Sequence, residues 1–103
     1  MAVEIPAEIT VTLDLIKGRS IAWPRIESSQ EIMAIGSAKP MEDAARIAFT
    51  ELVLWLEKDY GFNRLEAYML CTQVARARLA QMVDPLYTFV AKFPKKYLPK
   101  KSR

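Results

Sequence analysis

The sequence of 103 residues contains no histidine. Imidazole is the base of the Ser-His-Asp and Cys-His constellations, and it is the commonest side-chain ligand for zinc and other transition metals. The lack of histidine therefore excludes both catalytic constellations from this chain acting alone. Hydrolytic chemistry would need carboxylates, lysine, tyrosine or a second polypeptide.

Cysteine occurs once, at Cys71. A single cysteine cannot form a disulfide within the chain, which fits a reducing, cytoplasmic compartment. Cys71 lies on the apolar stripe of a predicted helix, so we expect a small core residue rather than a nucleophile. Long apolar runs are also lacking, because none approaches the roughly 18–20 residues of a membrane span. The N-terminus shows no basic-then-apolar pattern, so no signal peptide is expected.

Glycine is scarce, with three residues in the chain. The segment 36–40 lacks the Gly-Lys-Ser/Thr ending of a phosphate-binding loop, so it is predicted to be a strand-to-helix turn. No stretch clusters carboxylates as a calcium or magnesium loop does. Asp14 and Glu27 could face each other across a hairpin and share acid–base work. The carboxylates weighed for such a role are Glu4, Glu8, Asp14, Glu27, Glu31 and Asp84.

The net charge of +3 combines two regions of opposite sign. Residues 1–91 contain nine basic and twelve acidic residues. From residue 92 onward every charged residue is basic: Lys92, Lys95, Lys96, Lys100, Lys101 and Arg103. A basic tail permits binding of nucleic acid, with affinity that falls steeply with salt. Because the body has no basic face, we expect a solvated C-terminus. The predicted organisation is one domain over residues 1–94 and a basic tail over 95–103.

Three extended segments precede the helices. Residues 4–17 alternate, with Ile9, Val11 and Leu13 on the apolar side, which predicts a half-buried strand. A second extended run, 21–27, contains Pro24, which favours an edge strand or a bulge. A third strand is predicted over 30–38. A three-stranded antiparallel meander is the simplest arrangement of these segments.

Two helices and two further strands follow. The first helix is predicted from Pro40 to Tyr60, with Gly61 as its left-handed terminal residue. The second runs from Asn63 to Leu79, and Glu66 completes a capping box with Asn63. Short strands are expected over 79–83 and 86–93. The order βββααββ indicates an α+β fold, a mainly antiparallel sheet with a two-helix hairpin packed on one face.

Five runs of the sequence resemble the C-terminal part of the acetamidase/formamidase family. They are EIPAEITV (4–11), WPRIE (23–27), IGSAKPMEDA (35–44), NRLEAYML (63–70) and QMVDP (81–85). They occur in the family's order, and the resemblance extends from about Glu4 to Leu98.

The resemblance implies hydrolysis of small linear amides to a carboxylate and ammonia by metal-dependent, cytoplasmic homo-oligomers. The family's metal-binding region, of the Gly-Asp-x-His and Gly-Asp-Gly-Glu type, lies upstream of the stretch that matches Glu4. The resemblance therefore implies a divalent metal in the complete family site and none on this chain alone. Glu4, Arg25 and Glu27 match recurrent family positions. Arg25 and Glu27 would form a supporting ion pair or line the pocket, and the catalytic residues stay unassigned.

Two functions of different classes follow. The chain is the C-terminal part of an amidohydrolase, inactive alone and completed by an N-terminal polypeptide, as a split subunit or the product of a truncated gene. Alternatively, it is a non-catalytic assembly module that self-associates through the strand 87–93 and its N-terminal edge.

Overall fold

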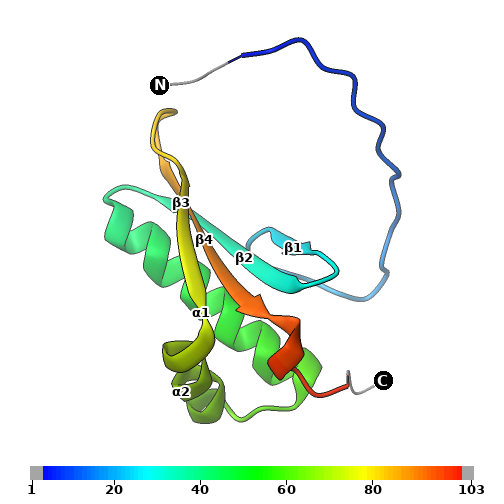
Figure 1. Cartoon of the computed structure of the whole chain (residues 1–103), viewed down its shortest axis with the longest axis vertical. Coiled ribbons are helices and arrows are strands. Elements are labelled where there is room, and N and C mark those ends of the chain that lie inside the picture. Colours follow the sequence, from blue (N-terminus) through cyan, green and yellow to red (C-terminus); the bar gives the residue numbers. More distant parts are fainter. Residues whose placement is uncertain (1–3, 101–103) are drawn as a thin grey trace.

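The computed structural model describes residues 4–100, which form an α+β domain with one antiparallel sheet (Figure 1). The elements in chain order are β1 (Arg25–Glu27), β2 (Glu31–Ala38), α1 (Met41–Tyr60), α2 (Arg64–Val74), β3 (Arg76–Gln81), β4 (Tyr87–Pro94) and the short 3-10 helix η1 (Lys95–Tyr97). The predicted α+β class, the antiparallel sheet and the helical hairpin are confirmed. No described helix is both long and apolar enough to cross a membrane.

The four strands lie in the order β1-β2-β4-β3. The central pair, β2 and β4, is in register from Glu31 opposite Pro94 to Ala38 opposite Tyr87. Strand β3 pairs with β4 on the other side, and a bulge interrupts the ladder between Leu79 and Gln81. Strand β1 is short and lies at an edge, as Pro24 before it predicts.

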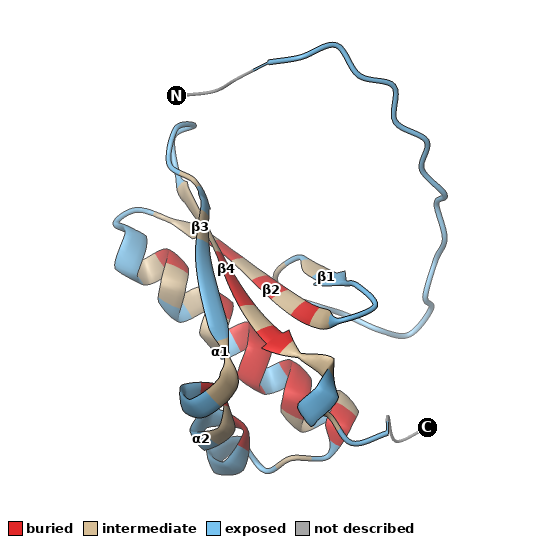
Figure 2. Ribbon diagram, viewed as in Figure 1, coloured by how far each residue is buried: buried red, intermediate tan, exposed pale blue. Residues whose placement is uncertain are grey.

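Helix α1 covers one face of the sheet and contacts both central strands (Figure 1). Burial alternates along β2, where Ile32, Ala34 and Gly36 face the helix and the residues between them are partly exposed. Figure 2 shows the buried residues gathered where α1 meets the central strands. The core cluster consists of Ile32, Ala34, Ala48, Leu52, Val53, Trp55, Leu56, Tyr60, Ala67, Cys71, Ala91 and Phe93.

Gly36 sets how closely β2 approaches α1. A Cβ atom at this position would lie 2.8 Å from the Ala48 backbone nitrogen and 2.9 Å from the Ile47 Cβ. Helix backbone cannot move aside as a flexible side chain does, so a larger residue here would push the helix from the sheet.

The corner between the helices is built as its sequence predicts. Gly61 ends α1 in the left-handed conformation, with φ of 74°. The Asn63 side chain accepts a hydrogen bond from the Glu66 backbone N–H, and the Glu66 carboxylate accepts one from the Asn63 N–H. This reciprocal capping box satisfies two donors that the start of α2 would otherwise leave without partners.

The predicted first strand is wrong. Within the described chain, residues 4–24 form neither helix nor strand, and Ile9, Val11 and Leu13 are exposed. Alternation makes a segment fit for a sheet, but a strand forms only when a neighbour pairs with its backbone. Of the second extended run, 21–27, the part Arg25–Glu27 forms a strand.

The second helix is shorter than predicted. It ends at Val74, and the Ala75 N–H caps it by donating to the Cys71 carbonyl. Residues 76–81, placed in the helix up to Leu79, form β3 instead. Alanine, leucine and arginine favour helix locally, but pairing with β4 overrides that propensity.

The 3-10 helix η1 follows β4 directly, so the first residues of the predicted tail, 95–103, belong to the folded domain and contact the sheet. Lys95 Nζ lies 2.7 Å from Glu27 Oε1 on β1, and the Lys95 N–H donates to the Gln30 carbonyl. Residues 1–3 and 101–103, including the basic residues Lys101 and Arg103, lie outside the described residues. The domain boundary stays a prediction.

Candidate functional site

Arg25 and Glu51 form a buried ion pair between β1 and α1. Arg25 Nε donates to Glu51 Oε1 at 2.8 Å, and Arg25 Nη2 lies 2.7 Å from the same oxygen. The Arg25 side chain is 14% exposed and the Glu51 side chain 4%. The guanidinium carbon also lies 4.8 Å from the centre of the Trp55 ring, within the range of a cation–π interaction.

A second carboxylate, Asp59, lies on the same side of α1, about two turns beyond Glu51. The Trp55 Nε1–H donates to Asp59 Oδ2 at 3.1 Å, and Arg19 Nη2 lies 2.6 Å from Asp59 Oδ1. Burial alone would raise the pKa of Asp59. The hydrogen bond and charge of Arg19, the hydrogen bond of Trp55 and the charge of Arg25 outweigh burial, so the pKa is lowered from 3.8.

We name Arg19, Arg25, Glu51, Trp55 and Asp59 the β1–α1 polar cluster. The three helical members stand four residues apart and therefore share one side of α1. In the described part of the chain, every buried side-chain nitrogen and oxygen has a hydrogen-bond partner. Each of the two carboxylates is paired with an arginine, so the cluster is suited to fixing β1 on α1.

Arg25 and Glu27, which the family resemblance suggests as partners in an ion pair, each form an ion pair with another residue. Arg25 pairs with Glu51, and Glu27 pairs with Lys95. Glu4 lies in the exposed N-terminal segment. Asp14 lies in the same segment, so the hairpin expected to bring Asp14 opposite Glu27 does not form.

The divalent metal that the resemblance implies does not fit the residues described here. Across residues 4–100, no three side chains of histidine, cysteine, aspartate or glutamate come together as a metal site requires. The carboxylates of the buried Glu51 and the partly buried Asp59 are each paired with an arginine. We therefore derive no catalytic step through a metal on this chain.

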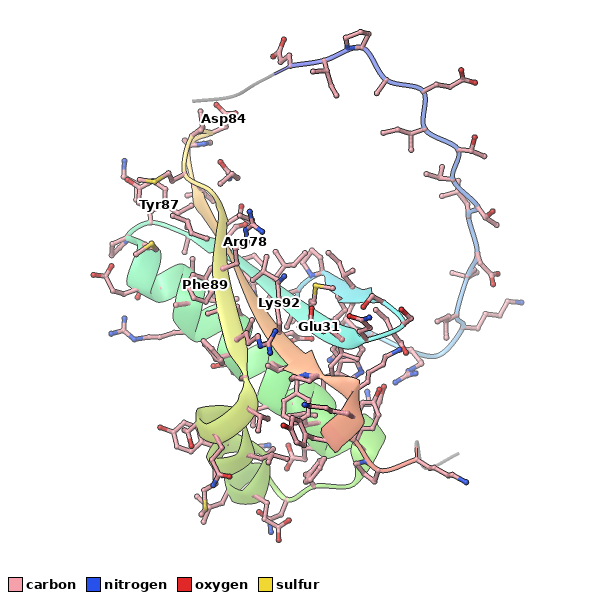
Figure 3. All side chains as sticks on the ribbon, viewed as in Figure 1. Glu31, Arg78, Asp84, Tyr87, Phe89 and Lys92 are labelled. Carbon is pink, nitrogen blue, oxygen red and sulfur yellow. The ribbon has the colours of Figure 1, made fainter. Side chains whose placement is uncertain are left out.

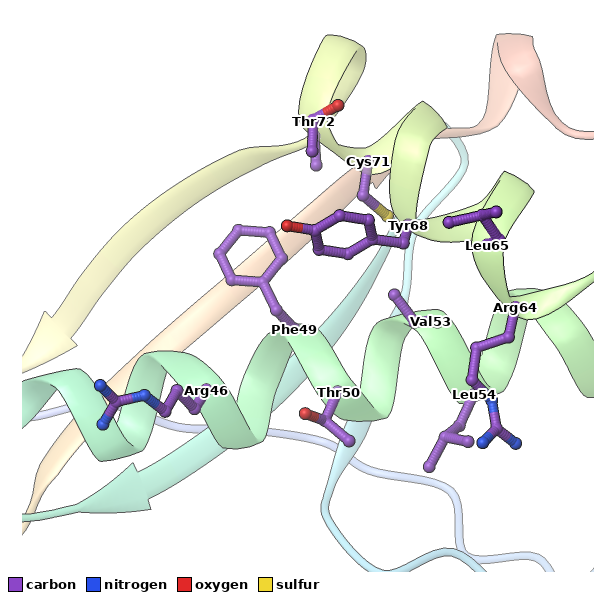
Figure 4. A pocket seen from close by; sticks show the side chains of 11 residues that line it. Arg46, Phe49, Thr50, Val53, Leu54, Arg64, Leu65, Tyr68, Cys71 and Thr72 are labelled. Atoms are coloured by element: carbon purple, nitrogen blue, oxygen red, sulfur yellow. The ribbon is translucent and has the colours of Figure 1, made fainter.

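An apolar groove of about 1000 Å³ lies between α1 and α2 (Figure 4). Figure 4 shows Phe49 and Val53 of α1 on one side, with Tyr68 and Cys71 of α2 across from them. Burial raises the pKa of the Cys71 thiol to about 11. The thiol is therefore protonated near neutral pH. The prediction that Cys71 is a small core residue is confirmed by its burial in the core cluster.

Sequence reasoning missed Glu51. The signal was available, because Glu51 follows Ala48 by three residues and precedes Trp55 by four, on the stripe that α1 buries. A charged residue at a core position requires a partner of opposite charge. Arg25 lies 26 residues away in sequence, and only the fold shows that it is that partner.

Solved structures show what the fold is similar to. An acetamidase from Yersinia enterocolitica matches with 49% identity and a TM-score of 0.77, over 79% of this chain and 24% of that one. An acetamidase from Bacillus halodurans matches at 26% identity, with a TM-score of 0.71, over 79% of this chain and 28% of its own. A predicted acetamidase/formamidase from Thermoanaerobacter tengcongensis matches at 25% identity with a TM-score of 0.72, over 79% and 27%.

The chain thus spans about a quarter of the length of these proteins. Among family models none matches the sequence. A search of curated proteins likewise gives no match.

Proposed function

Because this chain resembles acetamidases and formamidases in sequence and fold over 79% of its length, we propose that it is the C-terminal part of an amidohydrolase of that type. The complete protein would hydrolyse the C–N bond of small linear amides, giving a carboxylate and ammonia. The observation that carries the proposal is the 49% identity to an acetamidase together with a TM-score of 0.77.

In this proposal the chain contributes scaffold, and an N-terminal polypeptide contributes the metal-site motif. Two observations support that division. The chain spans about a quarter of its solved relatives, and the carboxylates of the β1–α1 polar cluster are occupied by arginines. Arg25 is then a positioning residue, because it holds β1 against α1 through Glu51. We place the assembly in the cytoplasm, since the single cysteine suits a reducing compartment.

Complementation tests the proposal. The purified chain is mixed with a polypeptide comprising the part of the Yersinia enterocolitica acetamidase that this chain does not match. Release of ammonia from formamide and acetamide is followed, together with metal content. We expect turnover from the mixture and none from either component.

Variants distinguish a positioning role from a general loss of structure. Arg25→Lys keeps the charge but loses the paired contacts to Glu51, so we expect reduced kcat in the mixture. Lys58→Met changes an exposed residue of α1 and should leave activity unchanged. Circular dichroism of each variant checks that the chain is folded.

Two results would contradict the proposal. Turnover by the chain alone would show that it carries a complete site. A stable complex with no turnover of either amide would instead favour the non-catalytic assembly module.

A further inference from the structure

The N-terminal segment 8–15 has the pattern of a strand but lies outside the sheet. Its apolar row is almost fully solvent-exposed, with Ile9 at 80%, Val11 at 71%, Leu13 at 91% and Leu15 at 74%. The alternate row is polar and includes Glu8 and Asp14. Figure 3 shows side chains projecting from both sides of this segment as it runs clear of the domain. An exposed row of large apolar side chains marks an interaction surface.

Strand β3 offers an edge to which such a segment can pair. In the sheet formed by the described residues, β3 is the last strand and pairs with β4 alone. An edge strand presents backbone N–H and C=O groups that an added strand can satisfy. Strand β3 has six residues, so it can pair with most of the eight-residue segment.

The helical side of this edge is apolar. The groove between α1 and α2 includes Ala75, the residue just before β3, and Phe49. The Phe49 ring packs against Phe89 with centroids 6.1 Å apart, and Phe89 is paired with Leu79 of β3. A strand added beside β3 would therefore place its inner side chains along this groove.

The opposite side of the edge is basic. Arg76 and Arg78 alternate along β3 with Ala77 and Leu79, whose partners Ala91 and Phe89 lie on the helical face. The two arginines therefore face away from the helices, and Figure 3 labels Arg78 on this strand. An incoming strand complements this edge if the side chains on its helical side are apolar and those on its opposite side are acidic.

The segment 8–15 meets both requirements, with Ile9, Val11, Leu13 and Leu15 on one side and Glu8 and Asp14 on the other. We propose that this segment of a second copy of the chain adds to β3, and that two chains exchange segments reciprocally in a two-fold dimer. The second copy is favoured over the same chain because the segment continues from β1, at the opposite edge of the sheet. Residues 4–20 form a wide arc outside the domain (Figure 1), and none of them is a strand of the sheet. The proposal does not depend on the amidase function.

Matched variants and a mass measurement test the proposal. Light scattering of the full chain, over a range of concentrations, should give twice the monomer mass of 11.8 kDa. Val11→Asp places a charge on the row that faces the groove, and should reduce the particle to the monomer mass. Thr12→Asp adds the same charge on the row that faces Arg76 and Arg78, and should keep the dimer. Both positions are exposed in the single chain, so neither substitution disturbs its core.

Charge reversal tests the polar side separately. The double substitution Arg76→Glu and Arg78→Glu should weaken the dimer at least tenfold at low salt. Adding Glu8→Lys and Asp14→Lys to the same chain should restore it, because the outer rows again carry opposite charges.

Hydrogen exchange locates the contact. Amides of residues 9–15 should be protected in the dimer and exchange freely in Val11→Asp. A monomer with protected amides would show that the segment docks on its own chain, and a monomer with unprotected amides would show that it does not dock. A dimer that survives Val11→Asp would show that another surface joins the copies. Each of these three results overturns the proposal.

Discussion

Arg25 on β1 and Glu51 on α1 form an ion pair with 2.7 Å between Nη2 and Oε1, at the edge of the apolar core. Strand β1 has three residues and lies at the edge of the sheet, so its ladder with β2 is short. Besides its hydrogen bonds to β2, the edge strand β1 is therefore also attached to α1, through this ion pair.

Removing one partner of this pair leaves a buried charge without compensation. We expect Arg25→Met to lower the free energy of unfolding by about 3–5 kcal/mol. The double variant Arg25→Met with Glu51→Met should recover much of that loss, because the charge is removed along with its partner. Urea unfolding of Arg25→Met, of Glu51→Met and of the double variant measures the coupling energy between the two side chains.

The exposed pair of Arg46 and Asp43 on α1 is the control, with the same chemistry in water. Arg46→Met should cost about 0.5 kcal/mol. Equal losses at Arg25 and Arg46 would show that burial of the Arg25–Glu51 pair has no energetic consequence.

Gly36→Ala tests the close approach of β2 to α1. The added Cβ meets the helix backbone at Ala48, which cannot yield locally, so we expect destabilisation of about 3 kcal/mol or more. Gly61→Ala is the comparison, since its Cβ would meet nothing within 4 Å and only the left-handed conformation costs about 1 kcal/mol. Thermal unfolding of both variants shows which substitution destabilises the fold more. A larger loss at Gly61 would contradict the packing argument.

The Cys71 thiol links stability to alkaline pH. Its pKa is about 11 in the folded chain and 9.0 when unperturbed, so the unfolded state loses the proton first as pH rises. The free energy of unfolding should therefore fall between about pH 9 and 11. Cys71→Ala should flatten that part of the profile. Alkylation by iodoacetamide at pH 8.5 should be slow in the native protein and fast in urea. Rapid alkylation of the native chain would contradict burial of the thiol.

The Asp59 carboxylate links stability to acidic pH. Its pKa in the folded chain is lowered from 3.8, so the unfolded state takes up a proton first as pH falls. The contribution of Asp59 to the free energy of unfolding is fully present at pH values above 3.8, the pKa in the unfolded state. It is lost as the pH falls through the lower pKa of the folded state. Asp59→Asn should reduce the loss of stability on acidification. Asp84→Asn, in the exposed turn before β4, is the control. Identical acid profiles for wild type and Asp59→Asn would contradict the role given to Arg19.

Local signals in the sequence predict the parts of the fold that depend on nearby residues. Gly61, Asn63 and Glu66 define the helical corner because caps and turns need contacts only a few residues apart. The strand β2 is predicted within one residue at each end for a similar reason, since its own alternation shows which side is buried.

The parts that depend on distant partners are less well predicted. Residues 4–17 have the alternation of a strand, yet a strand requires a neighbour that the described chain does not place beside them. Residues 76–81 have helical propensity, and only β4 makes them a strand. The candidate site is similar, because Arg25 is identified from the sequence as a possible half of an ion pair whereas Glu51 is not.

The order of the strands also bears on how the chain folds. The central partners β2 and β4 are separated in sequence by α1, α2 and β3. Ile32 therefore pairs with Phe93, a residue some sixty positions later in the chain. Pairings so distant in sequence are slow to form because a long loop must close first. During synthesis, the part of α1 that packs on β4 would stay uncovered until β4 leaves the ribosome. The middle of this small domain is therefore the last part to close, and interrupted synthesis would expose the face of α1 that the finished fold covers best.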